Sequence, residues 1–390
     1  MTLDIPSRRL LMYSCSLTIL AEAENWHWPD IQHLSGFVGV AGGRFKSTTP
    51  KFLAALIIES HKLKGSILDT FWHELGKCDP KLKDNIQDIF VFGESLVNKD
   101  VTTALFAGLE RKQVNFAPLF KMAQKYFSQL IIAFKNLGGR HSASDDKSSV
   151  SDVASLSTET LLNRHASDPR CQVTLKELVF RRDGTSCPIS GDIFTSNEQG
   201  WREANLAHIV PNGIPNDRHP TIQGDLIKCL VAFAGQETAE LVITKLNTVS
   251  NVLNLEANVH LQYANMDWGI EALETDNEKI RYIFREMRSP FWSRGYALKD
   301  GDEIHFGRGD EGMTLEGPSP ALCNLALGIR RVVMMCGAAG LIAQIEEYAN
   351  DSDFEHIYIA SEEFCKILDA KLILEGAAID FNEENTLTSI

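Results

Sequence analysis

Two histidines and one asparagine in the middle third of the chain have residue types and spacing suited to hydrolytic chemistry. His208 lies in the segment Leu-Ala-His-Ile-Val-Pro-Asn (206–212), and Asn251 precedes His260 by nine residues. Imidazole exchanges protons near neutral pH and also ligates metal ions. Hydrolysis of a phosphodiester needs a base for water, a divalent cation for the developing charge, and a group that keeps the base aligned.

A short segment upstream adds a third element to this pattern. Residues 182–191 read Arg-Asp-Gly-Thr-Ser-Cys-Pro-Ile-Ser-Gly, with turn dipeptides at both ends, and two short strands around a turn are expected there. The three segments together resemble the HNH endonuclease family, in particular the HNH-domain proteins abundant in fungi. That family has a Cys-x-x-[Ser/Thr]-Gly hairpin, an Ala-His-Ile-x-Pro strand, and an Asn followed nine residues later by His. The resemblance covers residues 171 to about 345 and leaves residues 1–137 unexplained.

The resemblance implies a role for each of these residues. His208, on a strand and followed by a rigid proline, would be the general base, and Asn251 would hold its imidazole through the other ring nitrogen. His260, near the middle of the following helix, would bind a divalent metal ion (Mg, Mn or Zn). Phosphate contacts would come from nearby arginines, namely Arg181, Arg182, Arg202 and Arg218.

The sequence departs from the family pattern at the metal site. Many HNH nucleases place an acid directly before the base histidine, or three residues before it, and these positions hold Ala207 and Asn205 here. Hard cations such as Mg²⁺ prefer oxygen ligands, so one histidine cannot hold the ion by itself. The nearest candidates for the missing carboxylate are Glu203, Asp183 and Asp267.

Two functional hypotheses remain open from the sequence. The first is a metal-dependent nuclease, favoured by the spacing of His208, Asn251 and His260. The second is a repurposed HNH fold without nuclease activity, acting as a binding module or as an enzyme on a small molecule. The missing acid and the negative charge of the region favour the second hypothesis.

The charge distribution limits where a nucleic acid could bind. The chain has 38 Lys and Arg residues against 52 Asp and Glu residues, which gives a net charge of -14. Residues 171–260 carry only -3 of this, whereas residues 261–390 carry -13. A polyanion is repelled by clustered negative charge, so a nucleic acid is expected to bind away from residues 261–390, with contacts through residues 171–260. No membrane association is expected, and the oligomeric state is not indicated.

The elements that must position these residues suggest an α+β fold. A mostly helical N-terminal region (1–137) is expected to precede a Ser/Asp/Gly-rich linker (138–170). An HNH-like domain with a C-terminal extension follows (171–350), containing a ββα-metal core embedded in additional helices and a small β-rich segment near 296–306. A C-terminal helix and tail complete the chain (351–390).

Several local patterns give further expectations. A hairpin is expected near 37–45, a helix over 254–266 with Trp268 close to the face of His260, and another helix over 321–348. The segment Gly-Arg-Gly-Asp-Glu-Gly (307–312) matches a dinucleotide motif, but two prolines follow it, so a turn is expected.

The start of the chain and its cysteines bear on location. Arg8 and Arg9 precede an apolar stretch that resembles a signal peptide, but polar residues interrupt this stretch, which favours a helix. None of the eight cysteines forms a Cys-x-x-Cys pair, so neither a zinc ribbon nor a disulfide scaffold is indicated. The expected location is intracellular, in the cytoplasm or nucleus.

Overall fold

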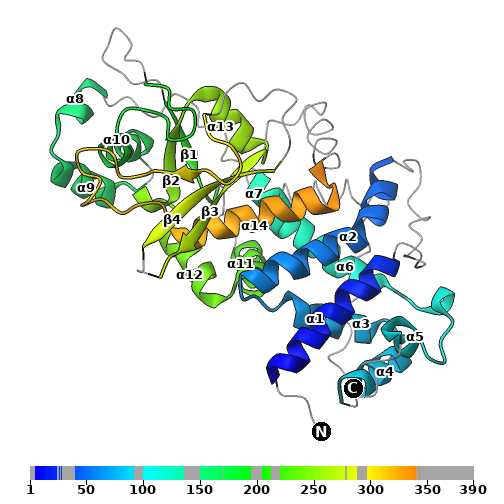
Figure 1. Ribbon diagram of the computed structural model, residues 1–390. Helices are drawn as coiled ribbons and strands as arrows, with labels where there is room; N and C mark the ends of the chain where they lie inside the picture. Colours follow the sequence, from blue (N-terminus) through cyan, green and yellow to red (C-terminus); the bar gives the residue numbers. More distant parts are fainter. Residues whose placement is uncertain are drawn as a thin grey trace. The chain divides into compact units, whose positions relative to one another are not determined.

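The computed structural model describes most of the chain and divides it into two compact units (Figure 1). The described residues are 5–23, 26, 28, 40–91, 100–135, 150–169, 171–194, 204–211, 220–276, 279–287, 297–339 and 342. Unit 1 contains Met1–Leu130 and most of the chain after Met335, and unit 2 contains Ile131–Met334. The C-terminal helix and tail expected over 351–390 lie outside the described residues.

Unit 1 is helical, as its apolar periodicity predicts. Its elements are α1 (Ile5–Glu22), α2 (Val40–Lys62), α3 (Ile67–Lys77), α4 (Pro80–Val91), α5 (Val101–Leu105), the 3-10 turn η3 (Arg111–Gln113) and α6 (Ala117–Tyr126), and the π-helical turn η4 (Phe127–Ile132) crosses into unit 2. Its core includes Trp26 stacked on Phe116, with ring centroids 4.3 Å apart. The hairpin expected near 37–45 is wrong from residue 40 onwards, because α2 already begins there and continues into the helix-period apolar run from Phe52.

The end of α2 offers a test of local backbone strain. Lys64 is exposed and has a φ of 61°, a left-handed conformation that glycine adopts without the steric cost of a Cβ atom. The backbone N–H of Gly65 donates to Ser60 O at 2.8 Å, so the helix ends in a Schellman-type turn. We expect Lys64→Gly to raise the free energy of unfolding by about 1 kcal/mol, measured by urea denaturation followed by tryptophan fluorescence. Lys83→Gly, inside α4, should lower it by about 1 kcal/mol, and a loss of stability in both variants would contradict the assignment.

Unit 2 combines helices with two small antiparallel sheets, so the α+β class is confirmed. Its elements are α7 (Ala133–Lys135), α8 (Val150–Ser155), α9 (Thr158–Ser167), α10 (Gln172–Asp183), β1 (Asn205–His208), α11 (Pro220–Ala234), α12 (Gln236–Lys245), the 3-10 turn η5 (Val249–Asn251), β2 (Val252–Leu255), α13 (Ala257–Ala264), β3 (Trp268–Glu274), β4 (Ile280–Glu286), β5 (Glu303–Ile304) and α14 (Pro320–Cys336). Strands β1 and β2 form one sheet, and β3, β4 and β5 form the other.

The segment expected to be a linker is folded over residues 150–169. Helices α8 and α9 bury Val153 and Leu161 in a core cluster with residues of α10. The guanidinium of Arg181 ties this segment down by donating to Thr158 Oγ1 at 2.9 Å and to Leu156 O. The composition misled the prediction because two buried aliphatic side chains and one arginine suffice to anchor the segment. Residues 138–149 and residue 170 of the expected linker lie outside the described residues.

The helix expected over 254–266 is shorter and is followed by a strand that was not expected. Helix α13 ends at Ala264, and Met266, with a φ of 61°, turns the chain into β3. Trp268 begins β3 opposite Glu286 of β4 and is completely buried, so it packs in the core from a strand instead of extending the helix. No glycine marks this left-handed turn, which is why the sequence does not reveal it.

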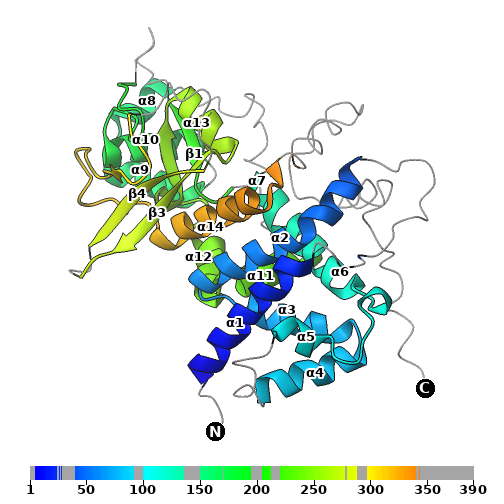
Figure 2. The same cartoon turned by 45° about the vertical axis from the view of Figure 1, so that its right-hand side comes forward.

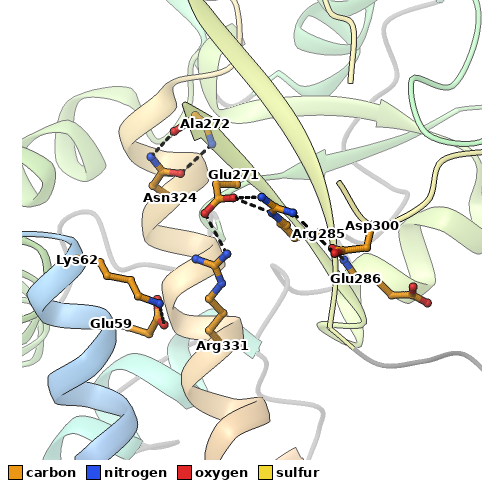
Figure 3. A network of polar contacts seen from close by, with 9 residues as sticks. All are labelled: Glu59, Lys62, Glu271, Ala272, Arg285, Glu286, Asp300, Asn324 and Arg331. Atoms are coloured by element: carbon orange, nitrogen blue, oxygen red, sulfur yellow. Dashed lines mark hydrogen bonds and ion pairs between the residues drawn. The ribbon is translucent and has the colours of Figure 1, made fainter. Parts of the chain in front are cut away.

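Helix α14 packs on the β3–β4 hairpin, as Figures 1 and 2 both show. The side-chain amide of Asn324 pairs with the backbone of Ala272, accepting from its N–H at 2.8 Å and donating to its carbonyl at 2.9 Å. In Figure 3, Arg285 of β4 and Arg331 of α14 both point at the carboxylate of Glu271. These contacts fix the sheet to the helix. No helix in the described part of the chain is long and apolar enough to cross a membrane.

Candidate functional site

A two-stranded ribbon and the helix after it bring the candidate residues into one part of unit 2. Strand β1 pairs antiparallel with β2, and His208, its last residue, lies opposite Val252. Helix α13 begins directly after β2 and is capped by Glu256, whose carboxylate accepts from the backbone N–H groups of Asn258 and Val259. Figures 1 and 2 show α13 beside the β1–β2 ribbon. The ribbon therefore carries the first histidine and the helix carries the second.

Asn251 is completely buried and binds the backbone that follows His208. Its side-chain N–H groups donate to Val210 O at 2.9 Å and to Leu246 O at 2.8 Å. Its side-chain oxygen accepts from the backbone N–H of Val210 at 2.9 Å. The backbone N–H of Ile209 also donates to Asn251 O at 2.8 Å. Asn251 thus fixes the backbone of Ile209 through its own carbonyl and the backbone of Val210 through its side-chain amide.

This arrangement corrects the contact expected for Asn251. The sequence suggested that its amide would hold the imidazole of His208, but both amide N–H groups donate to backbone carbonyls. An asparagine side chain has only two such donors, so none remains to donate to the imidazole, and the side-chain oxygen accepts from the backbone N–H of Val210. Any orienting effect on His208 is therefore exerted through the main chain that carries the histidine.

His260 lies on α13 and is half-buried. Burial lowers the pKa of its imidazole below the ordinary histidine value of 6.5, which favours the neutral ring at neutral pH. Three residues later on the same helix, the hydroxyl of Tyr263 donates to Ile209 O at 3.3 Å. Residues three apart share a helix face, so α13 presents His260 from the face that contacts the end of β1.

The lowered histidine pKa predicts a loss of stability in mild acid. His165 of α9 shares this property, and burial is the main cause for both residues. Because the unfolded chain binds these protons more readily, the free energy of unfolding should hold above about pH 6.5 and fall below it, through the folded-state pKa values. When the free energy of unfolding is measured by denaturation between pH 5 and 8, it should fall less steeply with decreasing pH in His260→Gln than in the wild type. Exposed His305→Gln should match the wild type, and equal slopes in all three proteins would contradict the prediction.

Arg182 and Asp183 are paired inside unit 2, which corrects both roles expected for them. The guanidinium of Arg182 is completely buried and donates to both oxygens of Asp183, at 3.0 and 2.7 Å. It also donates to Val249 O at 2.6 Å and to Val252 O at 2.9 Å. No phosphate can reach this guanidinium, and the carboxylate is already occupied by Arg182 and by the N–H of Gly307. Arg182 is therefore not a phosphate ligand, and Asp183 is not available to a metal.

The glycine-rich segment 307–312 covers this pair and forms a turn, as expected. The N–H of Gly309 donates to Arg182 O at 2.9 Å, and a Cβ atom at this glycine would lie 2.2 Å from Arg181 O. Only glycine allows the loop to approach the end of α10 this closely. The dinucleotide motif is thus explained by packing. Arg181 is also engaged, since its guanidinium holds the α8–α9 segment.

The described residues do not complete a metal site around His260. Among them, no group of three His, Cys, Asp or Glu side chains could hold an ion. Ala207 stands where many HNH nucleases have an acid, and it is buried on the face of β1 opposite to His208. Glu203, Arg202 and Arg218 lie outside the described residues.

Sequence reasoning missed two residues at this site, Tyr263 and Arg330. The guanidinium of Arg330, on α14, lies 3.9 Å from the centre of the Tyr263 ring and is itself buried. Tyr263 ends the segment 250–263 that also holds Asn251 and His260, but the sequence gives it no role, and Arg330 is 67 residues from Tyr263 along the chain. The chain matches no protein-family model, no curated protein and no solved structure.

Proposed function

We propose that unit 2 is an HNH-type module that hydrolyses phosphodiester bonds, with His208 as the general base. The observation that carries the proposal is the set of hydrogen bonds between Asn251 and the backbone after His208. A base is effective only when it is held within hydrogen-bond reach of the water that it deprotonates. A completely buried amide with all its donors engaged supplies that rigidity at the end of β1.

His260 has the second role in this proposal. Its half-buried imidazole, kept neutral by burial, can offer a lone pair to a divalent cation (Mg, Mn or Zn). Glu203 is the candidate for the carboxylate that hard cations require. Metal binding by His260 can therefore be tested separately from cleavage, by a binding measurement on the protein itself.

Addition of Mn²⁺ or Zn²⁺ should stabilise the wild-type protein if His260 binds the ion. A ligand that binds only the folded state at a concentration 100 times its Kd adds about 2.7 kcal/mol. We expect the midpoint of thermal unfolding to rise on metal addition in the wild type, and to rise much less in His260→Ala. The variant His305→Ala, which removes an exposed histidine of unit 2, should respond like the wild type. An equal rise in all three proteins would show that His260 is not a ligand.

The substrate in this proposal is a nucleic acid, contacted through residues 171–260. Two of the four arginines considered for phosphate contact, Arg181 and Arg182, are engaged in holding unit 2 together. Arg202 and Arg218 are therefore the candidates that remain. Neutralising two phosphates would give only a shallow dependence of binding on salt, since each contact adds about one to the slope of log K against log salt.

A second candidate function is a repurposed fold that binds a ligand without cleaving phosphodiesters. It is favoured by the burial of Ala207 at the position of the usual acid, and by the pairing of Asp183 with Arg182. Under this second proposal, a buried alanine takes the place of one metal-binding carboxylate, and the carboxylate of Asp183 serves a structural ion pair. A protein of this kind would bind nucleic acid or a small molecule and release it unchanged.

Incubation of the purified full chain with plasmid DNA and with labelled single-stranded DNA and RNA separates the two candidates. The reactions should contain Mg²⁺, Mn²⁺ or Zn²⁺ in parallel, with EDTA as the metal-free arm. The nuclease proposal expects nicked or shortened products from the wild type. Retention of intact nucleic acid in a gel-shift assay, without products under any of these conditions, would overturn it and favour the second candidate.

A further inference from the structure

Tyr263 connects the two halves of the candidate site. Its hydroxyl donates to Ile209 O, the carbonyl directly after His208, and its Cα lies on α13 three residues after His260. The side chain is 1% exposed, and burial raises the pKa of its hydroxyl. The hydroxyl therefore stays protonated at physiological pH and can donate throughout the range in which a histidine base works.

The ring of Tyr263 is held on two sides. Arg330 of α14 places its guanidinium 3.9 Å from the ring centre, and the ring of Trp268 lies 4.6 Å away in a tilted arrangement. Trp268 also donates from Nε1 to Val259 O at 3.2 Å, which ties the start of β3 to α13. The tyrosine ring cannot change rotamer without displacing these neighbours, so the position of its hydroxyl is fixed.

Helix α14 reaches this ring because β3 carries a glycine beside it. A Cβ atom at Gly269 would lie 2.8 Å from Leu327 Cδ1 and 3.3 Å from Arg330 Cδ. Arg330 also donates to Ala326 O at 3.1 Å and, at 3.5 Å, to the backbone carbonyl of Tyr263. Its cationic group therefore lies against the C-terminal turn of α13, where the helix dipole favours positive charge.

We propose that Tyr263 is a positioning residue that sets the end of β1, with His208, against the helix that carries His260, and that Arg330 holds the tyrosine in place. The proposal rests on the proposed function only for its effect on the rate, since the geometry itself can be tested without activity. Asn251 fixes the backbone after His208 within the ribbon, and Tyr263 fixes that backbone to α13. Loss of the second contact would let the two histidines move relative to each other.

The test is Tyr263→Phe, with Tyr282→Phe as the matched control. Both tyrosines lie in unit 2 and donate to a backbone carbonyl, but the partner of Tyr282 is Pro318, which precedes α14 and belongs to neither strand of the ribbon. The first readout is the set of ring ¹H–¹⁵N signals of the histidines, with the His208 signal assigned from a His208→Gln spectrum. We expect Tyr263→Phe to shift or broaden the His208 signal and Tyr282→Phe to leave it unchanged.

The second readout is cleavage. Tyr263→Phe should lower kcat by about tenfold at unchanged KM, because a displaced base reacts more slowly while the substrate contacts stay intact. Arg330→Met, which removes the guanidinium from the ring, should also shift or broaden the His208 signal. A wild type without cleavage would overturn the proposed function, while the ring signals would still decide the positioning role. Unchanged His208 signals in both Tyr263→Phe and Arg330→Met would overturn the positioning role, whatever the activity.

Discussion

Arg182→Ala is expected to lower the free energy of unfolding of unit 2 by about 3–5 kcal/mol, a large part of the stability of a typical domain. The guanidinium is completely buried, and its removal leaves the carboxylate of Asp183 with an uncompensated charge in the core. The substitution also removes a charged donor from the carbonyl of Val249, in the turn before β2, and from that of Val252, the first residue of β2. Urea denaturation followed by far-UV circular dichroism measures the loss.

Two variants show whether the pair itself causes this effect. Arg281→Ala removes an arginine from a half-exposed ion pair with Glu303 and should cost less than about 1 kcal/mol. The double variant Arg182→Met/Asp183→Leu removes both charges and should be more stable than Arg182→Met alone. If Arg182→Ala costs no more than Arg281→Ala, the buried pair does not organise unit 2.

Asn251→Ala is the second substitution with a large expected effect, on both stability and activity. Three backbone groups lose their partner, namely the N–H and carbonyl of Val210 and the carbonyl of Leu246. Each buried polar group left without a hydrogen bond costs about 1–3 kcal/mol, so a total of about 3 kcal/mol or more is expected. Because the same contacts fix the backbone after His208, cleavage should fall further than the folded fraction does.

Asn254→Ala is the matched control for this prediction. Asn254 is a buried asparagine on the adjoining strand, and the structure gives its side chain one hydrogen bond, from Nδ2 to Lys176 O at 3.0 Å. Its removal should cost about 1 kcal/mol and leave the rate per folded molecule unchanged. Equal losses of rate in the two variants, after correction for folding, would show that Asn251 has no special connection to His208.

The strand that carries His208 and the helix that carries His260 could be expected from the sequence, but the pairing of β1 with β2 could not, because the paired residues lie more than 40 positions apart. The strand is implied by the Ala-His-Ile-Val-Pro segment that carries the family resemblance, and the asparagine and second histidine are only nine residues apart. The contact made by Asn251 could not be predicted in the same way, since a backbone carbonyl and an imidazole are equally suitable acceptors for an amide. Only the path of the chain after His208 decides between them.

The role of Arg182 lay beyond the sequence for a different physical reason. Arginine is almost never completely buried unless it is paired, so an arginine near a candidate site is naturally assigned to a phosphate. Its partners include Val249, 67 residues away, and Val252, 70 residues away, and these contacts leave no local pattern. The strand that begins at Trp268 was missed similarly, because the turn before it is made by Met266 and not by glycine.

The central claim is that His208 is the general base of a phosphodiester hydrolase. Its most direct test is the single-turnover rate of cleavage of a labelled oligonucleotide by the wild type, by His208→Ala and by exposed His305→Ala. General base catalysis contributes about 10²–10⁴-fold, so His208→Ala should be slower by at least 100-fold while His305→Ala retains the wild-type rate. Equal rates for the wild type and a correctly folded His208→Ala protein would contradict the claim.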